Sequence, residues 1–284
     1  MQNLFEQFVN DFDYSQHSRR AYLSDLKKFQ TWFESSNKES ISLTRITLQD
    51  ITGFRNHLQK VEKQAISSIN RCLVTIRKFL SWANDQGLTA NNPAKKVKEI
   101  KKQKSPPQFL GPSDVRKLLR EAELRNDVRG LAIISMFVYT GCRVSDLATL
   151  DLDNITIKER SGTVKFIGKG NKYREVSLPL AARQAVSKYL EVRPNVSLPR
   201  LFIGERGALT DKGIRNLLKK YGRFVGVDLY CHLLRHTFSH QYLKDTGDIV
   251  SLSQVLGHQN LNTTRIYCER TKSQLDELSE KVSY

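Results

Sequence analysis

The sequence predicts a mainly helical protein of two domains, the second of which also holds a small three-stranded antiparallel sheet. Over most of the first hundred residues, apolar side chains recur at intervals of three and four, the spacing of one face of an α-helix. Between residues 151 and 179 the interval shortens to two, which is typical of short strands. A basic stretch followed by Ser105-Pro106-Pro107 breaks regular structure between these regions. We therefore expect a helical domain at residues 1–100, a basic linker at 101–112 and a second domain at 113–284.

Three helices are expected in the first domain. Ser18 can cap the first, a second starts near Thr47, and a third extends from about residue 66 to 83, before Gly87. Their apolar residues share one face, and the opposite faces carry polar and basic side chains. Small helical modules often bind DNA through such faces, although any solvated amphipathic helix shows the same pattern. The candidate DNA contacts are Arg19, Arg20, Ser67, Asn70, Arg71 and Arg77.

The second domain is predicted to begin with a helix at Pro112-Ser113-Asp114, followed by a buried helix that Gly141 ends. Three strands follow, with turns at Ser161-Gly162 and at residues 168–171. Their alternating apolar pairs are Ile155/Ile157, Val164/Phe166 and Val176/Leu178.

Helices return after Pro179. Thr210 can cap one whose outward face adds Lys212 and Arg215 to the candidate DNA contacts. A last helix is expected at residues 271–284. It is too short to be stable alone, so it must pack on its own domain or on a neighbouring molecule.

The composition indicates a polyanionic partner. The 284 residues include 46 Lys and Arg against 29 Asp and Glu, a net charge of +17 at pH 7. Such an excess is most often found in proteins that bind nucleic acid, the alternative being a merely basic surface. The N-terminus does not resemble a signal peptide and no apolar run is long enough to span a bilayer, so we expect a cytoplasmic protein without membrane contact.

The four cysteines form no C-x-x-C pair, so neither a zinc site nor a disulfide framework is indicated. Cys72, Cys142, Cys231 and Cys268 are interpreted as small packing residues. We expect no cofactor and no metal. An acidic cluster for two Mg²⁺ ions is absent, and Gly168-Lys169-Gly170 lacks the spacing of an ATPase phosphate loop.

The residues between Cys231 and Tyr267 hold groups that suit phosphate chemistry. Four of the six histidines lie between residues 232 and 258. Transfer of a phosphodiester requires a nucleophile, cations for the phosphate, an acid for the leaving oxygen and a base. The candidates are Tyr267 as nucleophile, Arg143 and Arg235 as cations, Lys169 at a hairpin tip as the acid, and His232 and His258 for proton exchange.

The order of these residues resembles the tyrosine recombinases. The similarity is carried by T-G-C-R-V-S-D-L, G-K-G-N-K-Y-R-E-V-S-L-P, H-L-L-R-H-T-F, L-G-H and T-T-R-I-Y. S-R-R-A-Y-L-S-D-L-K-K-F and S-I-N-R-C-L-V-T-I-R-K-F-L-S-W-A extend it to nearly the whole chain. It implies a SAM-like helical core-binding domain followed by a mixed α/β catalytic domain. It also implies a catalytic set of Arg143, Lys169, His232, Arg235, His258 and Tyr267, supported by Asp146; we interpret His236 and His240 as structural residues that support their helix.

The resemblance implies DNA strand exchange without ATP or metal. Tyr267 would attack a DNA phosphate, form a 3′-phosphotyrosyl link and release a 5′-hydroxyl. Lys169 would be the general acid, His232 would assist proton transfer at the tyrosine, and the arginines and His258 would hold the phosphate. Two rounds in a homo- or hetero-tetramer on two recombination sites would pass through a Holliday junction. The helix at 271–284 would dock into a neighbouring protomer.

Other functions remain open at this point. A type IB-like topoisomerase uses the same chemistry but reseals the original strand, and a DNA-binding regulator would bind without cutting. Within recombinases, the role could be Xer-like chromosome-dimer resolution, resolution of transposon cointegrates, or integration by a small phage or integron enzyme. The core-binding pattern begins within the first twenty residues, which disfavours a large integrase with an additional N-terminal domain.

Overall fold

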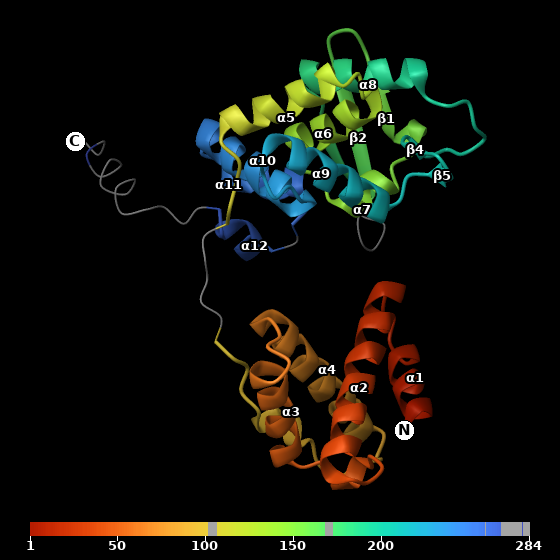
Figure 1. Ribbon diagram of the computed structural model, residues 1–284, viewed down its shortest axis with the longest axis vertical. Coiled ribbons are helices and arrows are strands. Elements are labelled where there is room, and N and C mark those ends of the chain that lie inside the picture. Colours follow the sequence, from red (N-terminus) through yellow and green to blue (C-terminus); the bar gives the residue numbers. More distant parts are fainter. Residues whose placement is uncertain (102–106, 168–172, 259, 268–279, 281–284) are drawn as a thin grey trace. The chain divides into compact units, whose positions relative to one another are not determined.

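The computed structural model describes residues 1–101, 107–167, 173–258, 260–267 and 280. The chain divides into two compact units, Met1–Lys104 and Ser105–Tyr284, each with its own hydrophobic core (Figure 1). Helices dominate both units, and the second unit also contains a three-stranded antiparallel sheet. These features confirm the predicted fold class.

The first unit packs its helices around a core of aromatic and aliphatic side chains. Its elements are α1 (Gln2–Asn10), α2 (Gln16–Asn37), the 3₁₀ turn η1 (Leu43–Arg45), α3 (Leu48–Lys60), α4 (Ile66–Asp85) and the 3₁₀ turn η2 (Pro93–Lys96). Helices α2, α3 and α4 correspond to the three predicted ones, whereas α1 lies outside the prediction. It forms because Phe5 and Phe8 can be buried, and both rings meet Phe79 of α4 edge to face.

Local capping explains where these helices begin. Helix α3 starts at Thr47 as predicted, and Thr47 is its cap: its Oγ1 accepts the Asp50 N–H at 3.2 Å while the Asp50 carboxylate accepts the Thr47 N–H at 2.8 Å. The predicted cap of α2 is wrong. Ser15, not Ser18, is that cap, because Ser15 Oγ accepts the Ser18 N–H at 3.2 Å and Ser18 already lies in the first turn.

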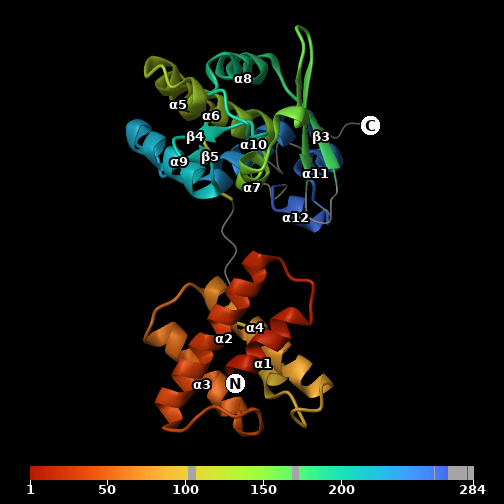
Figure 2. The same cartoon turned by 90° about the vertical axis from the view of Figure 1, so that its right-hand side faces the viewer.

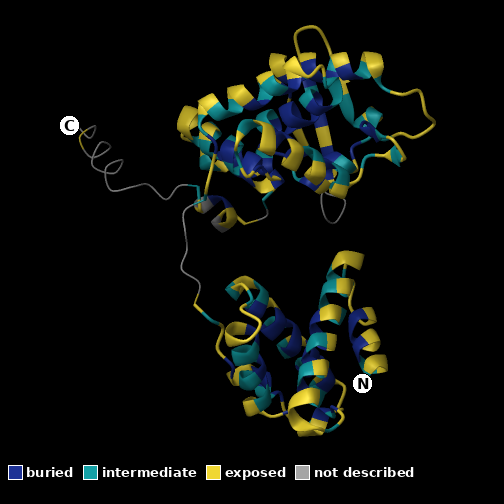
Figure 3. Cartoon of the chain, in the orientation of Figure 1, coloured by how far each residue is buried: buried dark blue, intermediate teal, exposed yellow. Residues whose placement is uncertain are grey.

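Helices α2 and α4 bury facing stripes and leave their opposite sides exposed (Figure 3). One polar group lies between them. Asp25 of α2 is 2% exposed, and its carboxylate accepts hydrogen bonds from Arg71 Nη1 at 2.6 Å, Cys72 Sγ at 3.1 Å and Thr75 Oγ1 at 3.0 Å, all on α4. A buried carboxylate is stable only when it is paired and hydrogen-bonded, so this cluster fixes the position of α2 on α4.

The second unit starts with α5 (Pro112–Leu124), α6 (Val128–Thr140) and α7 (Val144–Ala148), in agreement with the signals at Pro112 and Gly141. Then come the 3₁₀ turn η3 (Leu152–Asn154), strands β1 (Ile155–Ile157), β2 (Gly162–Ile167) and β3 (Tyr173–Ser177), and α8 (Leu180–Val192). The remainder is the strand pair β4 (Ile203–Gly204) and β5 (Gly207–Ala208), then α9 (Asp211–Val225), α10 (Cys231–Thr246), α11 (Ile249–Leu256) and α12 (Asn262–Arg265). Figure 2 shows β3 beside α11.

The sheet has the order β1-β2-β3, with Val164 opposite both Ile155 and Val176. Val164, Phe166 and Val176 are buried, as their alternation predicts. The first predicted turn ends before Gly162, which is the first residue of β2. A Cβ at this position would lie 2.7 Å from Arg183 Cδ. The second predicted turn, at 168–171, lies outside the described residues.

Helix α10 packs closely against the end of α6. Gly141 ends α6 with φ +59°, a left-handed conformation that favours glycine, and a Cβ at this position would overlap the Phe238 ring of α10. The two helices therefore approach closely where the α6 backbone carbonyls end. Cys72, Cys142 and Cys231 are free and buried, which agrees with a packing role; Cys268 lies outside the described residues.

Candidate active site

Helix α10 carries His232, Arg235 and His236, whose spacing of three and four brings them close together. Arg235 is 4% exposed. Its Nη1 donates to the Gly141 carbonyl oxygen at 2.6 Å and its Nη2 to the Leu256 carbonyl oxygen at 2.9 Å. Carbonyls at the ends of α6 and α11, which have no partner within their own helices, thus orient the guanidinium.

Arg143 lies at the start of α7 and reaches the end of α11, where its Nη2 donates to the Gly257 carbonyl oxygen at 3.4 Å. Asp146 is buried beside it. Its Oδ2 accepts the Arg143 backbone N–H at 2.9 Å and Arg174 Nη2 at 2.6 Å. These contacts hold the backbone at Arg143, as a supporting role for Asp146 requires.

Arg174 of β3 is a site residue that the sequence interpretation missed. Its side chain is 10% exposed, its guanidinium lies 4.8 Å from the Phe166 ring centroid, and its buried Nε has no hydrogen-bond partner. The strand period offered a signal. Val176 and Leu178 face inward, so Arg174, two residues earlier in the alternation, shares their face.

His258 is held by two hydrogen bonds that determine its tautomer. Arg235 Nη2 lies 2.8 Å from Nε2, and Thr264 Oγ1 lies 2.7 Å from Nδ1. Burial, followed by the positive charges of Arg235, Arg143 and Arg174, lowers the pKa of His258 to about 4. The imidazole is therefore neutral at pH 7. Since arginine can only donate, Nε2 accepts and Nδ1–H donates to Thr264.

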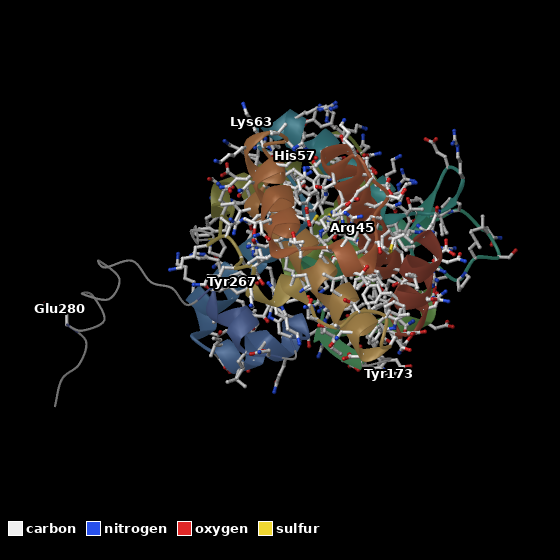
Figure 4. The ribbon with its side chains drawn as sticks, turned by 90° about the horizontal axis from the view of Figure 1, so that it is seen from below. Arg45, His57, Lys63, Tyr173, Tyr267 and Glu280 are labelled. Carbon is white, nitrogen blue, oxygen red and sulfur yellow. The ribbon has the colours of Figure 1, made fainter. Side chains whose placement is uncertain are left out.

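Tyr267, which Figure 4 labels, follows α12 in the second unit. Its Oη lies 2.8 Å from His236 Nδ1. Burial raises the pKa of Tyr267, while the Ser239 hydroxyl and the charges of Arg235 and Arg143 act in the opposite direction. The phenol is therefore protonated at pH 7 and close to both arginines.

His236, interpreted from the sequence as a residue that supports its helix, also contacts the Tyr267 hydroxyl through its imidazole. His232, which the resemblance places at the tyrosine, is exposed. Partial desolvation of its ring, followed by the charges of Arg235, Arg215 and Arg143, lowers the pKa of His232. The two histidines are four residues apart on one helix face, so spacing alone did not separate their positions. His240 stacks on Phe109 with ring centroids 3.6 Å apart, as suits a structural role.

Positive charge is concentrated at this site. Arg143 and Arg174 line an open cleft of about 990 Å³, together with Tyr173, Gly257 and His258. Burial, and then the charges of Arg143 and Arg174, lowers the pKa of Arg235 to about 10. Three neighbouring guanidinium groups with Asp146 as a shared buried carboxylate favour the binding of an anion such as a phosphate.

Two predicted parts of the site lie outside the described residues. These are Lys169 and the helix at 271–284, of which the structure describes residue 280 alone. Across the described ranges, no group of three or more His, Cys, Asp or Glu side chains is arranged to hold a metal ion.

Several candidate DNA contacts of the first unit have structural partners. The Asn70 amide exchanges two hydrogen bonds of 2.9 Å with the backbone of Ile100, and Arg77 donates to the carbonyl oxygens of Ala94 and Val97. These two side chains brace the chain after α4, which accounts for them without DNA. Arg19 likewise donates to the Tyr14 carbonyl oxygen at 3.1 Å.

The other candidates keep accessible side chains. Four of them are exposed: Arg20, Ser67, Arg71 and Lys212. The Arg71 side chain stays accessible even though it pairs with Asp25. Arg215 is exposed and lies 3.8 Å from Asp211, and its charge contributes to the lowered pKa of His232. Of the candidate DNA contacts, Arg215 is therefore the one whose charge reaches a residue of the catalytic set.

Comparison with known families identifies both units. Residues 108–274 match the phage integrase family, and residues 2–87 match the phage integrase N-terminal SAM-like domain. The chain belongs to the phage integrase family of tyrosine recombinases. Both matches agree with the resemblance read from the motifs.

This recombinase is similar to curated relatives over almost its full length. The tyrosine recombinase XerC of Thermodesulfovibrio yellowstonii is 33% identical over 94% of this chain and 90% of the relative. The tyrosine recombinase XerD of Listeria monocytogenes is 28% identical over 98% of this chain and 97% of the relative.

Solved structures share its fold. XerH bound to a palindromic difH substrate in a post-cleavage complex matches with a TM-score of 0.80 at 21% identity, covering 98% of this chain and 84% of that one. A lambda integrase dimer bound to a COC′ core site matches with a TM-score of 0.74 at 17% identity, covering 94% of this chain and 93% of that one. Within the described part of this recombinase, no helix is long and apolar enough to cross a bilayer.

Proposed function

We propose that this recombinase exchanges strands at a specific site in duplex DNA through a 3′-phosphotyrosyl intermediate on Tyr267. The observation that carries the proposal is the placement of the Tyr267 hydroxyl against His236, close to the charges of Arg143 and Arg235. A half-buried phenol beside two arginines is suited to attack on a phosphodiester, because the cations draw the phosphate to the nucleophile.

The remaining groups have complementary roles. Arg143, Arg235 and neutral His258 would hold the non-bridging oxygens and stabilise the pentacoordinate phosphate. The Oη–P bond forms as the P–O5′ bond breaks, and the leaving 5′ oxygen takes a proton from a general acid, for which Lys169 is the candidate. The 5′-hydroxyl of a partner strand then attacks the phosphotyrosine. One phosphodiester replaces another of similar energy, so the exchange requires no ATP.

Complete recombination needs an assembly on two DNA sites. In this proposal four protomers assemble on a pair of sites. They exchange one pair of strands at a time and pass through a Holliday junction, and residues 271–284 would connect neighbouring protomers. The similarity to relatives named XerC and XerD supports an Xer-like role, in resolution of chromosome dimers or of transposon cointegrates.

A nicked suicide substrate tests the chemistry. When the nick lies next to the scissile phosphate, the short leaving strand diffuses away and a covalent protein–DNA complex accumulates. We expect the wild-type chain to form this complex and Tyr267→Phe to bind the same DNA without forming it. A DNA-binding regulator would give no complex with either. Joining of strands from two different duplexes separates a recombinase from a type IB-like topoisomerase, which would only relax supercoiled DNA.

A further inference from the structure

Two histidines one turn apart on α10 differ in their relation to Tyr267. His236 is half-buried, its Nδ1 lies 2.8 Å from Tyr267 Oη, and the two ring centroids are 5.4 Å apart. His232 is exposed, and its ring centroid lies 6.3 Å from that of His236. Among the described hydrogen bonds of the Tyr267 side chain, the histidine partner is therefore His236 and not the residue that the family motif indicates.

We propose that His236 is a catalytic residue, whose Nδ1 holds the Tyr267 hydroxyl and accepts its proton as the tyrosine attacks the DNA phosphate. The inference rests on the proposed function, since it assumes that Tyr267 is the nucleophile. It assigns the proton acceptor to a residue outside the set of six that the motif contains.

The step balances with the groups at hand. The Oη–H bond breaks, its proton moves to Nδ1, and the oxygen forms a bond to phosphorus while the P–O5′ bond breaks. His236 becomes an imidazolium. In the reverse reaction Oη leaves phosphorus as the incoming 5′-hydroxyl attacks, and the imidazolium returns the proton to Oη. The acceptor is then neutral again for the next exchange.

Geometry favours His236 as the acceptor. A general base must lie within hydrogen-bond reach of the proton that it removes, and 2.8 Å between heavy atoms meets this condition. His236 also follows Arg235 directly on α10, whose guanidinium is fixed by the carbonyl oxygens of Gly141 and Leu256. The base and a phosphate ligand are therefore adjacent on one rigid helix.

The protonation state is suitable for this role. Burial, followed by the charges of His232 and Arg235, lowers the pKa of His236 below its ordinary value of about 6.5. Among the residues that the structure describes, the titratable and charged groups that reach its ring are these two on its own helix and Tyr267 from the turn after α12. None of them is a carboxylate, so the ring is neutral at pH 7 and free to take a proton.

Matched asparagine substitutions along α10 test the assignment. His236→Asn places an amide near the position of Nδ1, so a hydrogen bond can remain but a proton cannot be accepted. His240→Asn is the control, one turn further along and stacked on Phe109. His232→Asn tests the competing assignment. The rate constant of covalent-complex formation on the nicked site is measured in single turnover between pH 5 and pH 8.5, with DNA affinity and melting temperature measured for each variant.

For the wild-type chain, we expect the rate to be constant near neutral pH and to fall as His236 is protonated, below about pH 6.5. His236→Asn should be slower at pH 7.5 by roughly 100-fold or more, the usual contribution of general base catalysis, with unchanged DNA affinity. The rate of His236→Asn should also not decrease at low pH through protonation of residue 236. His240→Asn should match the wild type, and His232→Asn should keep the fall at low pH whatever its rate.

Two results would overturn the assignment. One is a rate for His236→Asn within about threefold of the wild type. The other is a pH dependence that disappears in His232→Asn and persists in His236→Asn. If His236→Asn melts well below the wild type, His236→Gln serves as the second variant with the same expectations. Absence of a covalent complex with the wild-type chain would instead refute the proposed function itself.

Discussion

His258 lies in the middle of a series of hydrogen bonds that starts at the end of α6 and ends at the backbone of Tyr267. Arg235 donates to the Gly141 carbonyl oxygen and contacts His258 Nε2, and His258 Nδ1 donates to Thr264 Oγ1. The Thr264 carbonyl oxygen then accepts the Tyr267 N–H at 3.0 Å. Each bond constrains the next, so the orientation of Arg235 and His258 is coupled to the position of the tyrosine.

Thr264 is the residue where this coupling can be interrupted. It is fully buried, and Thr264→Val keeps its shape while leaving His258 Nδ1–H without its acceptor. A buried donor without a partner costs about 1–3 kcal/mol, so we expect covalent-complex formation to slow by roughly tenfold or more. Thr264→Ser should restore most of the rate. Thr246→Val, which alters an exposed hydroxyl at the end of α10, is the control; an equal loss in both valine variants would refute the coupling.

The neutral His258 also makes the second unit sensitive to acid. Its pKa is about 4 when folded and about 6.5 when unfolded. Between these values the unfolded chain binds more protons than the folded chain. The contribution of His258 to the free energy of unfolding should therefore be constant above about pH 6.5 and decrease from there to about pH 4. His258→Gln should flatten this dependence in urea titrations followed by circular dichroism. Trp32 and Trp82 are the two tryptophans and both lie in the first unit, so their fluorescence reports that unit separately.

At the scale of elements, Arg174 connects three parts of the second unit. From β3 it pairs with Asp146 of α7, and its side chain passes Gly257 at the end of α11 so closely that a Cβ there would lie 2.9 Å from Arg174 Cδ. Gly257 also has φ +64°, so the backbone at this point suits glycine for two reasons. The sheet, α7 and the segment that carries His258 are thereby held in one arrangement.

A double-mutant cycle measures this connection. Arg174→Met leaves the buried Asp146 carboxylate without its ion pair, and loss of one partner of a buried pair costs about 3–5 kcal/mol. We expect Arg174→Met to lower the stability of the second unit by that order, and Arg174→Met with Asp146→Asn to recover part of the loss. The free energy of unfolding is measured by urea titration of the full chain. Additive losses in the double variant would show that the two residues act independently.

At the scale of the whole molecule, both units carry positive charge, but some of the basic side chains are engaged in hydrogen bonds or ion pairs within the protein. Arg77 is engaged by the carbonyl oxygens of Ala94 and Val97 and by Glu99, whereas Arg20 is exposed. We therefore expect DNA to contact the basic side chains that have no such structural partners, which are fewer than the total of lysines and arginines.

The salt dependence of DNA binding distinguishes the two classes. Each phosphate contact contributes about −0.9 to the slope of log K against log salt concentration. Arg20→Ala should make that slope shallower by about one contact and leave stability unchanged. Arg77→Ala should lower the stability of the first unit without a comparable change of slope. Binding of one duplex site is measured from 50 to 300 mM salt; the reverse pattern would show that Arg77 is the DNA contact.

Periodicity and capping predicted most of the fold, because these signals are local. Helix α3 begins after Thr47 and α6 ends before Gly141, as these signals predicted. Helix α1 escaped prediction because its helical form depends on burying Phe5 and Phe8 against α4, a contact between distant segments. Ser15 and Ser18 are equally good caps by type, and only the helix geometry separates them.

The composition of the site could be predicted in part, whereas its internal contacts could not. Arg143, Arg235, His258 and Tyr267 come together as the motif implies. The role of Thr264 depends on a histidine six residues away around a turn, and that of Arg174 on a carboxylate 28 residues earlier. His232 and His236 have the same chemistry on the same helix face. Which of them reaches Tyr267 is decided by how the turn after α12 packs, and the local sequence does not encode that.

The concentration of guanidinium groups around Arg235 has a thermodynamic consequence for the recombinase as a whole. After burial, the charges of Arg143 and Arg174 lower the pKa of Arg235, so an anion bound among these guanidinium groups, such as a DNA phosphate, would relieve their repulsion. A ligand that binds the folded form alone stabilises it by RT ln(1 + [L]/Kd), about 2.7 kcal/mol at one hundred times Kd. Target recognition and stability of the second unit are then one linked equilibrium. We therefore expect the chain to resist unfolding more when it is bound to its specific DNA site than when it is bound to weaker, non-specific sites.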